Sequence, residues 1–192
     1  MDEAGFILQV KSNDPSAFQN LVHLYKDKVY NVALGLLQDN EDAEDTSQEV
    51  FIEVYQSISK FEEKSRLSSW IYRITVHKSL ELLRKQKRKK RSGVLLSMFG
   101  KEDQVQHPAS SPFYHPGVRL ENKERAAILF SAIGRLPENQ KTAFTLHKLE
   151  NLSYGEIAEV MQVSLGSVES LMFRAKQNLR KLLSDYYEKN ER

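Results

Sequence analysis

The chain has 192 residues with 28 lysines and arginines against 26 aspartates and glutamates, so its net charge of +2 does not by itself indicate a nucleic-acid partner. It contains no cysteine, which excludes disulfides, thiolate metal sites and thiol catalysis. The first thirty residues lack the pattern of a signal peptide, and no apolar run approaches the ~18 residues of a membrane span. The sequence therefore predicts a cytoplasmic protein.

The first part of the chain is predicted to form three helices. Apolar residues recur at helical spacing in each of them, beginning with the stretch from Phe18 to Leu36. The expected starting points, in chain order, are Asp14-Pro15, Asp39 or Asn40, and Ser69. We find no convincing alternating strand pattern, so the predicted fold class is all-α.

The helical pattern stops between Ser92 and Val118, a stretch that contains Pro108, Pro112 and Pro116. A segment of this length is more typical of a connection between domains than of a loop within one. We therefore predict two small helical domains, residues 1–92 and 119–192, joined by a flexible linker at 93–118. Apolar residues in the linker would dock on a partner or pack on the chain's own surface, and the sequence favours neither.

Helical patterns resume at about Leu120, and a capping box follows at Ser153 and Glu156. The helix that it starts is short and ends near Met161, and Ser164 is expected to cap the next one. Two helices joined by so tight a turn predict a helix-turn-helix, whose second helix would enter the major groove of DNA. A plain helical hairpin is the alternative. The positions expected to face outward are Ser167, Glu169, Ser170, Phe173, Arg174 and Gln177.

That second helix becomes basic toward its end. Residues 170–184 contain four bases, Arg174, Lys176, Arg180 and Lys181, and no acid. Cations in this position suit the phosphates beside the groove.

Two blocks of opposite charge lie upstream. Residues 39–53 contain seven acids and no base, which would repel nucleic acid and so indicates a protein-docking face or a solvated helix exterior. Residues 84–91 contain seven bases and continue the helix that carries Trp70, Tyr72 and Arg73. Aromatic rings near dense positive charge suit single-stranded nucleic acid, although Trp70 and Phe61 could instead belong to the core.

Together these segments resemble the extracytoplasmic-function (ECF) sigma factors, small promoter-recognition subunits of bacterial RNA polymerase. The likeness extends from about Ala17 to Tyr187 except for the linker. It is most specific in the Leu-Pro-Glu start, Leu-Ser-Tyr-x-Glu-Ile-Ala, Gly-Ser-Val and Arg-Ala-Lys of the C-terminal domain.

The resemblance implies three sets of site residues. Docking on the clamp of the large catalytic subunit of core polymerase would use Asp42, Asp45, Gln48, Glu49, Phe51 and Glu53. The opened strand and the proximal promoter element would be bound by Lys60, Phe61, Arg66, Ser68, Ser69, Trp70, Arg73, His77, Arg84, Lys85 and Arg88, with the loop 62–69 holding a flipped base. The distal element would be read by Ser153, Tyr154, Ser164, Ser167, Glu169, Ser170, Phe173, Arg174, Lys176 and Gln177.

The sequence departs from the family pattern in several places. His77 stands where the family usually has Asn, Glu81 replaces a usual Asp, and Thr46-Ser47 interrupts what is often an apolar pair. Glu169 and Leu171 occupy positions where many members carry Lys and Arg, so the family's distal promoter sequence does not carry over to this chain.

The resemblance predicts core RNA polymerase, promoter DNA and an anti-sigma factor as partners. A dimeric helix-turn-helix regulator is the alternative, but it leaves the acidic helix without a purpose. An enzyme is disfavoured because the five histidines lack metal-ligand spacing and there is no Gly-rich phosphate loop. We therefore expect no catalytic residues, metal or cofactor.

Overall fold

The computed structural model describes residues 3–12, 14–97 and 120–190. Within these ranges the regular elements are helices and none is a strand, which confirms the all-α prediction. Their bounds are α1 Glu3–Lys11, α2 Pro15–Leu37, α3 Asn40–Ser57, the 3₁₀ turn η1 Ile58–Lys60, α4 Leu67–Ser97, α5 Leu120–Gly134, α6 Glu138–Leu149, α7 Tyr154–Met161 and α8 Leu165–Asn190.

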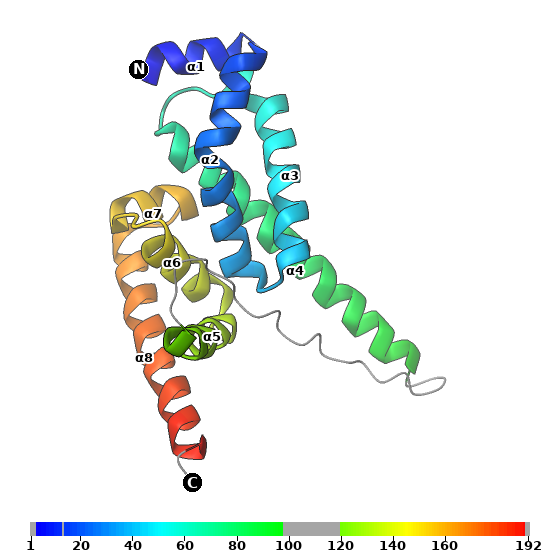
Figure 1. Ribbon diagram of the computed structural model, residues 1–192, viewed down its shortest axis with the longest axis vertical. Coiled ribbons are helices and arrows are strands. Elements are labelled where there is room, and N and C mark those ends of the chain that lie inside the picture. The colour runs from blue at the N-terminus through cyan, green and yellow to red at the C-terminus, as the bar shows by residue number, and fades with distance from the viewer. Residues whose placement is uncertain (1–2, 13, 98–119, 191–192) are drawn as a thin grey trace.

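Three long helices, α2, α3 and α4, lie side by side in the N-terminal half (Figure 1). Local capping fixes where two of them begin, as the sequence predicts. The Asp14 carboxylate accepts from the backbone N–H of Ser16 at 2.8 Å, and Asp39 accepts from that of Asp42 at 3.0 Å. Each bond satisfies a donor that the first turn of a helix leaves free, so the start of α2 and α3 is set within three residues.

The apolar stripes of these helices meet in one core. Its members on α2, α3, η1 and α4 include Leu21, Val29, Val50, Val54, Ile58 and Ile71. The helix α1, which the sequence analysis did not predict, closes the outer end of this core with Phe6, Ile7 and Val10. It is nine residues long, too short to show a clear apolar period.

The helix α4 continues through Ser97, past the predicted end of the first domain at residue 92. Gly93 within it costs about 1 kcal/mol of helix stability relative to alanine, which a helix of this length tolerates. The first residues of the predicted linker are therefore helical, and residues 98–119 lie outside the described chain.

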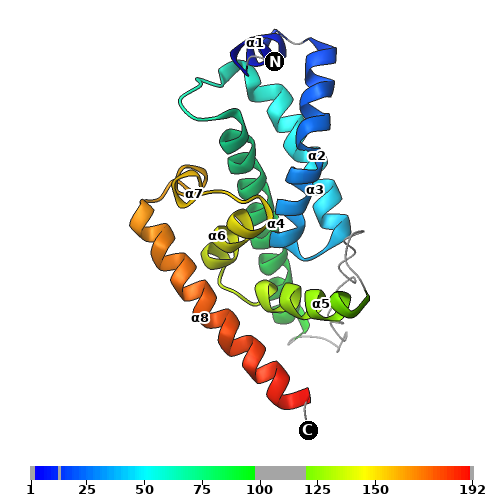
Figure 2. The same ribbon diagram turned by 60° about the vertical axis from the view of Figure 1, so that its left-hand side comes forward.

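The C-terminal half packs α6, α7 and α8 together, with α5 crossing beside them (Figure 2). The predicted capping box is present. Ser153 Oγ accepts from Glu156 N at 3.3 Å, and Glu156 Oε2 accepts from Ser153 N at 2.9 Å. Gln162 ends α7 in the left-handed conformation at φ 55°, and Ser164 Oγ accepts from Ser167 N at 3.2 Å to start α8. This geometry confirms the helix-turn-helix.

The two halves share a continuous apolar core. Val32 and Leu36 of α2, with Tyr72 and Val76 of α4, join one buried cluster with the C-terminal helices. The members from those helices are Ala132, Leu136, Ala143, Phe144, Leu146, Ile157, Val160, Val168, Met172, Ala175 and Leu179. The halves therefore form one compact body, in which the C-terminal helices cover one side of α2 and α4 (Figure 2).

Polar bonds also cross this boundary. Lys141 on α6 is 6% exposed and its Nζ donates to the Leu36 carbonyl at 2.8 Å, near the C-terminal end of α2. Burial lowers the pKa of Lys141, with the positive charge of Lys87 acting in the same direction. The Tyr72 hydroxyl donates to Glu150 Oε2 at 2.6 Å, and burial raises the pKa of both groups.

Replacing Glu150 by glutamine is expected to raise the melting temperature at pH 7 by roughly 1–2 °C. The amide still accepts from Tyr72, and it removes a half-buried charge whose pKa burial raises. The native chain regains this free energy when Glu150 becomes protonated, so the advantage of E150Q should vanish as the pH falls through the raised pKa. Thermal unfolding of both proteins across a pH series tests this, and an E150Q protein less stable at pH 7 would contradict it.

Candidate nucleic-acid interface

The acidic block lies on the surface of α3. Glu44, Asp45, Gln48 and Glu49 are exposed, whereas the opposite side of the helix is buried. Of the other acids, Glu41 is exposed, whereas Asp39, Asp42 and Glu53 are partly buried and have polar partners. Asp42 Oδ2 accepts from Gln86 Nε2 at 2.8 Å, and Glu53 lies 3.6 Å from Lys78 Nζ. The acids are therefore available to an outside partner rather than enclosed in the fold.

Exposed apolar side chains stand beside these acids. Ile52 and Tyr55 on α3 are 56% and 51% exposed. The Phe18 ring packs edge-on against Tyr55 at 5.0 Å. Sequence reasoning did not single these residues out. The sequence signal was that two large apolar residues of an acidic helix, Ile52 and Tyr55, fall outside the helical spacing of its buried residues. A mixed acidic and apolar face suits a protein partner better than solvent.

The aromatic residues before and at the start of α4 differ in exposure. Phe61 is 5% exposed and belongs to the core, one of the two alternatives that the sequence left open. Trp70 is partly buried, with its ring 5.1 Å from that of Phe61. Ser69 is 2% exposed, while Lys60 is exposed and Ser68 is partly buried. In this arrangement Lys60 and Trp70 are open to a ligand and Phe61 and Ser69 are not.

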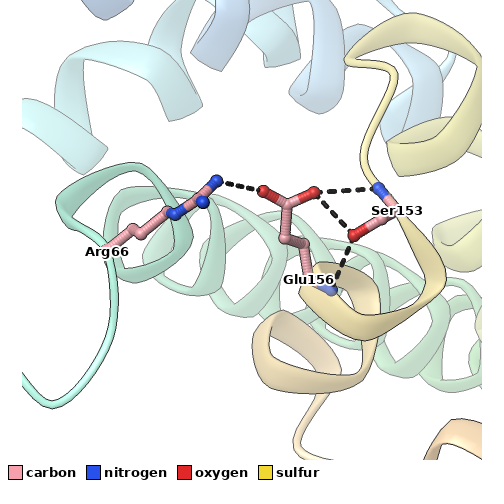
Figure 3. Close-up of polar contacts among 3 residues, drawn as sticks. All are labelled: Arg66, Ser153 and Glu156. Atoms are coloured by element: carbon pink, nitrogen blue, oxygen red, sulfur yellow. Dashed lines mark hydrogen bonds and ion pairs between the residues drawn. The ribbon is translucent and has the colours of Figure 1, made fainter.

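Two arginines of the predicted strand-binding set are bonded to α7. Figure 3 shows the Glu156 carboxylate between Arg66, from the loop before α4, and Ser153. Arg66 Nη1 donates to Glu156 Oε1 at 2.7 Å, and Arg73 Nη2 donates to the Glu159 carbonyl at 3.1 Å. Arg73 Nε is buried without an acceptor. Hydrogen bonds from Ser153, backbone first, lower the pKa of Glu156, and Arg66 lowers it further.

The basic run of α4 borders a cleft of about 780 Å³ between α4 and α6. The residues lining this cleft are His77, Glu81, Arg84, Lys87, Arg88 and Glu138. Lys87 Nζ lies 2.6 Å from Glu138 Oε1, which lowers the pKa of that carboxyl. Arg84, Lys85 and Arg88 are exposed, and two of these predicted backbone-binding cations, Arg84 and Arg88, line the cleft together.

The helix-turn-helix presents the predicted outward positions. Each of Ser167, Glu169, Ser170, Phe173, Arg174, Lys176 and Gln177 is exposed, and the Phe173 side chain is 63% exposed. The opposite side of α8 packs Val168, Met172 and Ala175 into the core. Tyr154, at the start of α7, is partly buried against the ring of His147 at 5.3 Å. One face of α8 is thus free to enter a groove.

Two family models match the two halves of the chain. Sigma-70 region 2 matches residues 21–89, and Sigma-70 region 4 matches residues 126–179. The ECF RNA polymerase sigma-E factor of Haemophilus influenzae is 33% identical over 180 residues, which cover 92% of this chain and 93% of that protein. The chain belongs to the ECF sigma factors. SigW of Bacillus subtilis, another member, is 31% identical over 183 residues, covering 93% and 95% of the two chains.

Solved structures agree with the fold of this ECF sigma factor. CnrH, solved in complex with the cytosolic domain of CnrY, gives a TM-score of 0.69 at 20% identity and covers 95% of this chain and 97% of its own. The sigma factor RpoE of Bartonella quintana, solved with the anti-sigma factor NepR, gives 0.64 at 23% identity and covers 87% and 96%. Within the described residues, no helix of this ECF sigma factor combines the length and apolar character of a membrane span.

Proposed function

We propose that this ECF sigma factor binds bacterial core RNA polymerase as an alternative promoter-recognition subunit and directs it to open DNA at specific promoters. The division of surface charge supports this best. An acidic and apolar face lies on α3, whereas exposed cations lie on α4 and on the outer face of α8. The protein takes no catalytic part in this role, and it would act in the cytoplasm with the polymerase.

The proposed domains are residues 1–92 and 119–192, with the linker at 93–118. In the first domain, Asp45 and Glu49 on α3 would meet the clamp of the large catalytic subunit, supported by the neighbouring apolar Ile52 and Tyr55. A partner surface that is positively charged around an apolar centre would complement this face.

The start of α4 and its basic continuation would hold the opened strand. Trp70 offers a ring for base stacking, and Arg66, Arg73 and Arg84 offer charge to the phosphates. Arg73 and Arg84 lie on α4 and Arg66 in the loop directly before it, so the three cations come from one continuous segment of the chain.

The helix α8 would read duplex DNA in the major groove. Glu169 lies near its N-terminal end, where residues of a recognition helix contact base edges. A carboxylate there accepts a hydrogen bond from the N4 amino group of cytosine, and Phe173 one turn later can contact a thymine methyl group. We propose that these two residues make the preferred distal element of this protein differ from that of relatives with basic residues at position 169.

Replacing Arg174 and Lys176 by alanine is expected to lower the salt dependence of duplex binding. Both side chains are exposed on α8, and each phosphate contact contributes about 0.9 to the slope of log affinity against log salt concentration. Loss of both should therefore reduce the slope by about 2. Fluorescence anisotropy with a labelled promoter duplex at several salt concentrations measures it, and an unchanged slope would show that these residues do not touch phosphates.

An anti-sigma factor is the proposed controlling partner. RpoE of Bartonella quintana, which shares this fold, was solved bound to such a protein. Whether the linker docks on a partner or packs on the chain's own surface stays open, because its residues 98–118 lie outside the described chain.

Run-off transcription with purified core polymerase and a genomic fragment library tests the proposed function. Transcripts that require this protein, start at a shared pair of motifs and arise from a one-to-one complex with core enzyme are the expected result. A helix-turn-helix regulator without polymerase docking would bind fragments but neither saturate core enzyme nor start transcription. Mapping the motifs also tests the cytosine expected opposite Glu169.

A further inference from the structure

Glu63, in the loop between η1 and α4, has a backbone conformation that residues with a side chain rarely adopt. Its φ is 59°, in the left-handed region that glycine enters freely. We infer that Lys11 is a positioning residue, whose ion pair with Glu63 holds residues 62–66 in the shape that takes up a base of the opened strand. The inference rests on the proposed function and on the flipped base that the family resemblance assigns to this loop, and it adds α1 to the strand-binding part of the protein.

The loop is anchored at both ends and exposed between them. Phe61 and Leu67 are buried in the core that α1 closes. Glu62, Glu63 and Lys64 are exposed where the loop passes beside α1 (Figure 1). Apolar packing therefore fixes where the loop begins and ends, whereas the path of the residues between them depends on polar contacts.

Lys11, the last residue of α1, makes such a contact. Its Nζ donates to Glu63 Oε1 at 2.5 Å and lies 5.6 Å from the centroid of the Phe61 ring. A lysine cation within about 6 Å of an aromatic face is attracted to it, so two partners hold the ammonium group. The middle of the loop is thereby tied to α1 while Glu63 is left-handed, which offsets part of the cost of that conformation.

The size of this effect separates the loop from the rest of the fold. The side chains of Lys11 and Glu63 are 22% and 45% exposed, and pairs this accessible contribute about two- to fivefold to an equilibrium. The helix α1 is held more firmly, because it buries Phe6, Ile7 and Val10. Loss of the pair should therefore loosen the loop and leave α1 in place.

The pair also lies within one half of the protein. Lys11 and Glu63 both belong to the N-terminal half, so their bond does not depend on the one from Arg66 to Glu156 of α7. It can therefore shape the loop in the polymerase complex as well as in the free chain.

The first measurement is of loop mobility. The chain has no cysteine, so Lys64→Cys places a single nitroxide label on an exposed residue of the loop. Lys11→Met keeps a long apolar side chain against Phe61 but removes the charge. In the labelled full chain this substitution should narrow the electron paramagnetic resonance line, as a more mobile label does, while the melting temperature stays close to that of the native chain.

The second measurement is of base preference in the holoenzyme. Fork-junction DNAs, taken from a promoter mapped by run-off transcription, carry each of the four bases at one unpaired position at a time. Lys11→Met should reduce the preference for the promoter base by about two- to fivefold at the position that the loop holds, and by less than about twofold elsewhere. A purely structural role of Lys11 would instead weaken binding to every fork alike.

Further variants act as controls. Lys26→Met removes the same charge from an exposed site on α2 and should behave like the native chain, as should Lys11→Arg, which keeps the pair. Glu63→Asn supplies a residue that tolerates the left-handed region but loses the pair, so adding Lys11→Met to it should cause no further change. The charge swap K11E/E63K should restore most of the base preference.

Several results would overturn the inference. They are a label as ordered in K11M as in the native chain, a mobile loop with native base preference, an equal loss of affinity for every fork, or a charge swap that restores neither property. Failure of the proposed function gives a different pattern, in which the native chain yields no run-off transcripts with core enzyme and no base preference among the forks, whatever the label shows.

Discussion

Replacing Asp45 and Glu49 together by lysine is expected to weaken binding of the full chain to core RNA polymerase by about 10- to 100-fold. Both side chains are exposed on α3, so the fold should tolerate the change. Charge reversal replaces attraction across an interface by repulsion, which costs more than simple truncation. Titration of labelled protein with core enzyme measures the affinity.

A charge-matched control separates docking from the general change in net charge. Asp27→Lys alters another exposed acid, on α2 outside the acidic block, by the same charge as Asp45→Lys. We expect D27K to bind core enzyme with affinity close to that of the native chain and D45K to bind more weakly. Equal affinities for all variants, with native melting temperatures, would remove the docking role of α3.

Replacing Trp70 by alanine and Arg73 by glutamine is expected to reduce promoter opening by about 5- to 100-fold, with a smaller effect on duplex binding. A base stacked on an aromatic ring contributes about 1–3 kcal/mol, and the arginine adds a charged bond to the backbone. Permanganate footprinting of thymines in the holoenzyme–promoter complex measures opening, and electrophoretic mobility shift measures duplex binding.

Trp70 also packs on Phe61, so the effect on folding must be separated from the effect on DNA. Trp70→Phe keeps an aromatic face and part of the packing, and it should retain most of the opening activity. Thermal unfolding of each variant checks the fold. Should W70A with R73Q open promoters as well as the native chain, the start of α4 does not hold the strand.

Features set by neighbouring residues were predictable from the sequence. Asp14, Asp39 and the Ser153–Glu156 capping box each act within three residues of the helix start, and the structure places those starts as predicted. Exposure of the acids on α3 and of the outer face of α8 also followed from helical spacing alone.

Features that depend on distant parts of the chain were not predictable in this way. From the sequence alone, Phe61 could be a core residue or a ring that stacks on a base. Its burial follows from packing against residues distant in the chain, which only the structure shows. The need for glycine at position 35 is likewise visible only in the structure, where an added Cβ would come 2.6 Å from Thr145 Cγ2. A glycine within an apolar helical stretch was the available sequence signal of close helix contact, whereas the burial of Lys141 left no signal in the sequence.

The long helix α4 fixes more than the position of its basic residues. Arg84, Lys85, Lys87, Arg88 and Lys89 stand on one continuous helix, whose last turns extend away from the rest of the protein (Figure 1). Successive residues advance by about 1.5 Å along its axis, so the cations keep a set spacing before any nucleic acid arrives. A disordered arm of the same composition would lose about 1–2 kcal/mol of backbone entropy for each residue that it ordered on binding. Because the backbone of α4 is already ordered as a helix, association with nucleic acid has to immobilise only its side chains.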